Sequence, residues 1–168
     1  MAVSMYDLSV ASFSRTLQSL SGILDKAIAH AAAKKFDGKV LAEARLFPDM
    51  FPLSRQVQVA CDFAKGCSAR LAGVEVPKYE DNETTLEELK ARVAKTLDFI
   101  ATLKPQQLQG SEERTITHEM RVMTLKMPGL QYLTAFALPN FYFHATTAYA
   151  LLRHNGLELG KRDFIGPV

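Results

Sequence analysis

Apolar residues recur every three or four positions along most of the chain, the pattern of helices that bury one face. Four stretches show this spacing: 6–33, 52–73, 86–103 and 129–154. Proline and glycine residues separate them, and both favour turns over helix interiors. The pattern therefore predicts four helices, with residues 39–51 as a short irregular connection between the first two.

Signals for helix ends support this division. Ser4 or Asp7 is placed to cap the first helix, because a side-chain oxygen there accepts a hydrogen bond from an unpaired backbone amide. Thr84 and Glu87 have the three-residue spacing of a capping box and precede the third helix. Pro139 falls inside the last stretch, where a proline removes a helical hydrogen bond, so we expect a kink or a division there.

A different pattern interrupts the helical periodicity before the last helix. β-branched residues alternate with other types over 115–117 and 122–127, which predicts a small hairpin with His118 exposed near its tip. Four helices and this strand pair predict an all-α four-helix up-and-down bundle, or a variant with a long crossover. The length of 168 residues is that of a single domain, which we assign to residues 1–168.

The stretch from Met127 to Leu152 contains no Asp, Glu, Lys or Arg, and it is long enough for a transmembrane helix. Two prolines, Asn140, His144 and several threonines interrupt it, and polar groups are costly at the centre of a bilayer. We therefore interpret it as the buried helix of a bundle and expect no membrane association. No basic segment precedes an apolar core at the N-terminus, so we expect a cytoplasmic protein.

Charge and cysteine content exclude further classes of protein. The 20 Lys and Arg residues nearly balance the 18 Asp and Glu residues, whereas a nucleic-acid-binding protein carries a clustered basic stripe. We therefore expect no nucleic-acid partner. Cys61 and Cys67 are too few for a disulfide scaffold, and we interpret them as small core residues.

Four-helix bundles often hold a metal site, but candidate ligands are few in this chain. No acidic residue lies between Glu119 and Glu158, so the two Glu-x-x-His motifs of a di-iron site are missing. Asn140 and His144 are four residues apart and share one helix face. Asp62 lies along the apolar stripe of the second helix, where a carboxylate is rare unless it is paired or metal-bound.

Asp62, Asn140 and His144 are thus a candidate set of ligands for a divalent metal such as Zn, Ni, Fe or Mn, with positions left open for a small molecule. Packing explains the same residues in another way: Asp62 accepts hydrogen bonds from a neighbouring helix, and His144 is a satisfied core histidine. No nucleophile motif or phosphate-binding loop is present, so whether the chain is an enzyme stays open.

Several segments resemble the DinB/YfiT-like superfamily of bacterial four-helix bundles, and more closely one of its uncharacterised families, a domain of unknown function. The resemblance spans nearly the whole chain and rests on Met5-Tyr6-Asp7, ARLFPDMFPLSRQVQ from Ala44, the helix around Cys61-Asp62, NFYFHATTAY from Asn140, RHNG from Arg153 and GKRDF from Gly160.

Many members of that superfamily carry three metal-binding histidines, one on the second helix and two spaced by four on the last. The corresponding positions here are Asp62, Asn140 and His144, of which only His144 keeps the ligand type. Some members are metal-using, thiol-dependent transferases or isomerases, and dimers are common. The resemblance thus implies a homodimer with a polar pocket for a divalent metal or a small molecule. The alternative is a non-catalytic bundle that acts through dimerisation or partner binding.

Overall fold

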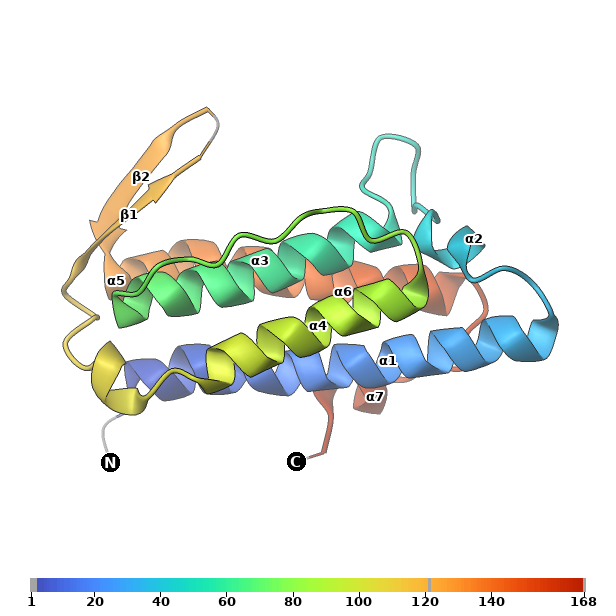
Figure 1. Ribbon diagram of the computed structural model, residues 1–168, viewed down its shortest axis with the longest axis horizontal. Coiled ribbons are helices and arrows are strands. Elements are labelled where there is room, and N and C mark those ends of the chain that lie inside the picture. The colour runs from blue at the N-terminus through green and yellow to red at the C-terminus, as the bar shows by residue number, and fades with distance from the viewer. Residues whose placement is uncertain (1–2, 121, 168) are drawn as a thin grey trace.

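The amphipathic stretches form the long helices of a bundle (Figure 1). The structure, a computed structural model, describes residues 3–120 and 122–167. The long helices are α1 (Ser12–Lys34), α3 (Leu53–Ala72), α4 (Leu86–Ala101) and α6 (Leu138–His154). Together with the hairpin described below, they confirm the predicted all-α four-helix bundle.

The four helices do not simply alternate in direction. α1 packs on α4, and α3 packs on both α4 and α6. The colours of Figure 1 show α1 and α6 running one way and α3 and α4 running the other way. Residues 73–85 therefore return along the length of the bundle before α4 begins, and we call this segment the strap. The bundle is the long-crossover variant, one of the two connectivities that the sequence left open.

Short helical segments connect and flank the long ones. η1 (Asp7–Ala11), a π-helical turn, leads directly into α1, and the 3₁₀-helix η2 (Pro105–Leu108) follows α4. Residues 39–51 were predicted to be an irregular connection, but they begin with one helical turn, α2 (Lys39–Ala42). α7 (Lys161–Ile165) packs against α1, so the C-terminal segment docks on the bundle itself.

The predicted hairpin is present as β1 (Thr115–Glu119) and β2 (Thr124–Pro128), which pair antiparallel with Glu119 opposite Thr124. His118 therefore lies inside β1, one residue before the end of the strand. The prediction that His118 is an exposed tip residue is wrong. Its ring is half-buried because the hairpin folds back onto Tyr132 and Phe136.

The last helical stretch continues through Pro139, where we predicted a kink or a division, and its helical geometry changes just before this proline. α5 (Gly129–Gln131) is followed by η3 (Tyr132–Ala137), a π-helical segment, and then by α6. Pro139 lies in the first turn of α6, directly after the π-helical segment. Within the described residues, neither this stretch nor any other helix is long and apolar enough to cross a membrane.

Side-chain caps fix where two of the helices begin. The Ser4 hydroxyl accepts a hydrogen bond from the Asp7 amide at 3.1 Å. At α4, the Thr85 hydroxyl accepts from the Glu88 amide at 3.2 Å, and the Glu88 carboxylate accepts from the Thr85 amide at 3.0 Å. This capping box lies one residue later than predicted, because consecutive threonines are followed by consecutive glutamates and two boxes overlap in the sequence.

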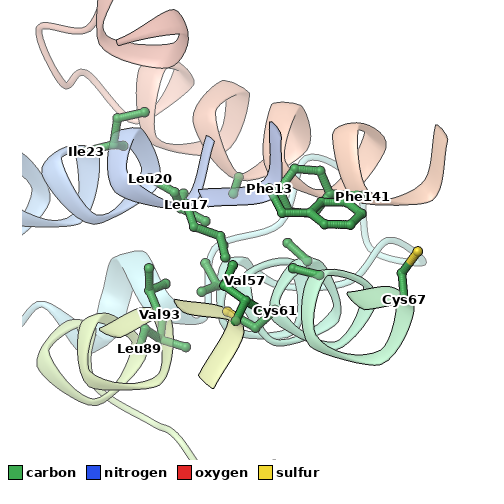
Figure 2. Packing of buried hydrophobic residues seen from close by; sticks show 14 of the residues in the cluster. Phe13, Leu17, Leu20, Ile23, Val57, Cys61, Cys67, Leu89, Val93 and Phe141 are labelled. Atoms are coloured by element: carbon green, nitrogen blue, oxygen red, sulfur yellow. The ribbon is translucent and has the colours of Figure 1, made fainter. Parts of the chain in front are cut away.

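Side chains from all four long helices fill the core (Figure 2). The rings of Phe13 on α1 and Phe141 on α6 meet edge to face, with centroids 4.8 Å apart. Cys61 and Cys67 are free and fully buried, which confirms their interpretation as core residues. Burial raises the pKa of the Cys61 thiol to about 12, so this thiol stays protonated and unreactive at neutral pH.

Candidate functional site

The three residues singled out from the sequence occupy two different faces of the bundle. Asn140 and His144 lie one turn apart on α6, whereas Asp62 lies on α3. None of the hydrogen bonds formed by the described residues joins Asp62 to Asn140 or His144. Each of the three is therefore considered with its own partners.

His144 is held by an amide from the facing helix. Its Nδ1 lies 2.7 Å from Gln56 Oε1, and Gln56 Nε2 donates to the backbone carbonyl of Phe51 at 3.2 Å. A carbonyl accepts hydrogen bonds only, so the Gln56 amide nitrogen must face Phe51 and its oxygen must face His144. The imidazole consequently carries its proton on Nδ1 and presents a lone pair at Nε2.

The surroundings of His144 keep the imidazole neutral. Its pKa is lowered, mainly by burial and to a smaller extent by the positive charge of Arg55. His144 is 8% exposed, and its Nε2 makes no hydrogen bond within the described residues without being wholly buried, so a narrow opening to solvent remains. At neutral pH this nitrogen is an accessible proton acceptor.

Three aromatic rings surround the imidazole of His144. The rings of Phe51 and Phe63 lie nearly parallel to the imidazole, with centroids 6.4 and 6.2 Å away, and Phe143 meets it edge-on at 5.1 Å. Phe51 and Phe143 are 49% and 58% exposed. The sequence suggested that the charge-free helix is buried on all sides. In the structure, α6 instead leaves an aromatic surface open beside His144.

Asn140 lies one turn before His144 and is half-buried. Its amide nitrogen donates to the Phe136 carbonyl at 2.8 Å, which leaves the side-chain oxygen as an acceptor. Phe136 itself packs edge to face on Phe63, with centroids 5.6 Å apart. The Asn140 side-chain oxygen is therefore a second acceptor on the helix face that carries His144.

Asp62 points toward α4 instead of α6. Gln56 and Phe63 are seven residues apart and face α6 together, and a one-residue step from Phe63 to Asp62 rotates the side chain by about 100°. Asp62 Oδ1 lies 2.8 Å from Lys65 Nζ and 2.9 Å from Arg92 Nη2. The position that orients His144 is filled by Gln56, a neutral residue for which the sequence gave no signal beyond its place on α3.

Arg92 gathers three carboxylates under the strap. Its side chain is 1% exposed, and its guanidinium contacts Asp62 and Asp81 at 2.9 Å and Glu83 at 3.0 Å. The Tyr79 ring lies over the same cluster, with Lys65 Nζ 4.5 Å from its centroid. These contacts tie the strap to α3 and α4. Asp62 thus belongs to a structural ion-pair network.

This donor arrangement is a poor fit to a divalent metal. Two cationic side chains already contact Asp62, and a metal ion there would face their repulsion. Among residues 3–120 and 122–167, no three His, Cys, Asp or Glu side chains form a group that could hold a metal. His144 remains as one imidazole ligand with amide neighbours, which suits transition metals less well than several imidazoles. Metal binding stays a prediction.

Comparison with known proteins gives two findings. The family described as Domain of unknown function (DUF1993) matches residues 5–165. A crystal structure of a DinB family member protein from Shewanella denitrificans has a TM-score of 0.91 and 43% sequence identity, covering 98% of this chain and 93% of that one. A search of curated proteins found no match.

Proposed function

The chain belongs to the DUF1993 family and has the fold of a DinB family member, and from this premise we propose that it binds a small organic molecule at His144. The imidazole Nε2 would accept a hydrogen bond or a proton from the ligand. The observation that carries the proposal is the chain of hydrogen bonds from the Phe51 carbonyl through Gln56 to His144 Nδ1.

These hydrogen bonds prepare His144 for acid–base chemistry. A fixed Nδ1–H directs the lone pair outward, so no tautomer change is needed before a ligand binds. The lowered pKa keeps the base unprotonated at neutral pH, and the same burial and Arg55 charge disfavour the imidazolium. A proton that His144 accepts is therefore readily passed on, which is what a general base requires. The neutral Gln56 orients the ring without holding the proton on it.

The walls of the site indicate the class of ligand. Phe51, Phe63 and Phe143 offer aromatic surfaces for an apolar ring, and Asn140 offers an amide oxygen one turn away. An apolar planar molecule with a weakly acidic O–H, N–H or S–H group meets both requirements. Proton removal from such a group, before its addition or transfer, is the reaction that these residues support best.

The experiment uses 4-nitrophenol, which combines an aromatic ring with an acidic hydroxyl. Binding is followed by its absorbance and by nitrogen NMR of histidine-labelled protein. We expect His144 to have the Nδ1–H tautomer and a pKa below the ordinary value of an imidazole. We expect His144→Ala to weaken binding about tenfold, the worth of one hydrogen bond in a partly buried site. His154→Ala, on the last turn of the same helix, is the matched control.

Two further variants separate the proposal from its competitors. Gln56→Glu places a carboxylate against Nδ1 and should raise the pKa of His144. Gln56→Leu removes the acceptor for the Nδ1 proton, so both neutral tautomers of the imidazole should then be populated. Titration with ZnCl₂ alone tests the metal site: a stoichiometric Zn²⁺ complex that His144→Ala abolishes would replace our proposal with the metal hypothesis. Equal 4-nitrophenol binding by wild type and His144→Ala would refute the role of His144 and favour the partner-binding alternative.

A further inference from the structure

A pocket lies where the hairpin and the strap meet α3 and η3. Its volume is about 310 Å³, which is at the small end of the range for ligand sites. Phe63, Val76 and Met120 provide apolar walls, and Arg70, His118 and Tyr132 provide polar groups. Asp62 and Lys65 also border the pocket, but they are paired with each other at 2.8 Å.

The polar groups of this pocket form one hydrogen-bonded row. Arg70 Nη1 lies 3.4 Å from the Tyr132 hydroxyl, and that hydroxyl lies 3.2 Å from His118 Nδ1. A guanidinium donates only, so the Tyr132 oxygen accepts from Arg70 and its proton points to His118. Burial and the charge of Arg70 lower the pKa of His118 to about 4, so the imidazole is neutral. The row therefore carries a single positive charge, on Arg70.

Arg70, which is half-buried, lacks the counter-ions that the buried Arg92 has. Arg92 contacts three carboxylates, whereas no carboxylate of the described residues lies within ion-pairing distance of Arg70. Gly66 makes space for it: a Cβ at this position would lie only 2.7 Å from Arg70 Nη1. The chain thus accommodates a guanidinium closely against α3 without neutralising its charge.

We propose that this pocket binds a small carboxylate with an apolar body, and that Arg70 pairs with the carboxylate. The planar guanidinium matches a carboxylate in two-point geometry, and desolvation by the surrounding apolar walls strengthens such a pair. Phe63, Val76 and Met120 then contact the body of the ligand. The neutral imidazole of His118 adds no repulsion and no competing charge.

The position of the pocket on a π-helical segment supports this assignment independently. η3 begins at Tyr132 and includes Phe136, and the two rings lie 5.8 Å apart between centroids. π-helical turns occur mostly as short insertions in α-helices and often at functional sites. Here the insertion brings the Tyr132 hydroxyl to both Arg70 and His118.

The test compares three probes by calorimetry and by NMR of the wild-type protein. Benzoate has the charge and the apolar body, benzamide has the same shape without the charge, and acetate has the charge without the body. We expect benzoate to bind at least tenfold more tightly than either and to shift the resonances of Gly66, Val76 and Met120. Benzamide binding as tightly as benzoate, or shifts confined to other residues, would overturn the proposal.

Variants show whether the benzoate binding measured for the wild-type protein depends on this pocket. Arg70→Met should abolish benzoate binding, and Gly66→Ala, which displaces the guanidinium, should weaken it severalfold. Arg15→Met, which removes an exposed arginine on α1, is the matched control and should bind benzoate normally. Benzoate binding that survives Arg70→Met contradicts the proposal. Phe63 lines this pocket and also stacks on His144, so the probes separate the two sites: Arg70→Met should keep 4-nitrophenol binding, which His144→Ala weakens.

Discussion

Replacing Arg92 with Met tests how the strap is held to the bundle. The arginine side chain is 1% exposed, and its guanidinium joins Asp62 on α3 to Asp81 and Glu83 on the strap. Methionine fills a similar volume without the charge. The substitution therefore removes the ion pairs while leaving little empty space.

The size of the effect follows from which carboxylates keep a partner. Asp62 retains Lys65 and Asp81 retains Arg55. Glu83, whose side chain is 13% exposed, retains only the Gln58 amide at 2.9 Å. One carboxylate is left buried without a cation, and breaking a buried pair in this way costs about 3–5 kcal/mol of unfolding free energy. We expect about 3 kcal/mol, because the Gln58 amide compensates in part.

Urea unfolding followed by circular dichroism measures this loss. Lys90→Met is the matched control, since Lys90 lies on the same helix in an exposed pair with Asp25 and should cost less than about 1 kcal/mol. Adding Glu83→Gln to Arg92→Met should restore at least half of the loss, and trypsin should cut Arg92→Met faster at Lys78 in the strap. A loss below about 1 kcal/mol, or no recovery in the double variant, would refute the reasoning.

Further predictions concern the hairpin junction, the cap of α4, pH and assembly. Gly129→Ala should prevent stable folding, measured as soluble yield and melting temperature, because the new Cβ would lie 1.9 Å from the Ser111 carbonyl oxygen. Thr85→Ala should lower the unfolding free energy by about 1 kcal/mol, the usual worth of a helix N-cap, as measured by urea unfolding. The pKa of His118 falls from 6.5 to about 4 on folding, so protonation favours the unfolded chain and stability should decline as pH falls through this interval; His118→Gln should flatten that part of the pH profile. Light scattering coupled to size exclusion should give twice the 18.6 kDa chain mass if the predicted homodimer forms, and the monomer mass would contradict it.

Features that depend on local sequence were predictable. The spacing of apolar residues predicts the helices, and β-branched residues that alternate with other types predict the hairpin. Pro139 marked the place where the last helix changes from π-helical to α-helical geometry, because proline acts on its own turn, whatever the rest of the fold does. The capping box was displaced by one residue only because Thr84 and Thr85 each have a glutamate three residues later.

Features that depend on how helices face each other were not predictable to the same extent. His118 is half-buried only because the hairpin folds back on η3, a contact between segments that local pattern does not encode. Asp62 and Phe63 are neighbours in sequence but face different helices, so an error of one position transfers a carboxylate from one face to the other. Gln56 meets His144 across 88 residues of chain and has no local signature.

The π-helical turn η3 has a consequence for how the family can vary. A π-turn holds one more residue than an α-turn, and one residue corresponds to about 100° of helix rotation. Deleting Ala135, an exposed residue of η3, would restore an α-helix and rotate the residues before it by about 100°, which would move Tyr132 away from Arg70 and Leu133 out of the core. A single insertion or deletion at this turn would thus disturb the core and the pocket beneath the hairpin together, so both constrain the length of η3.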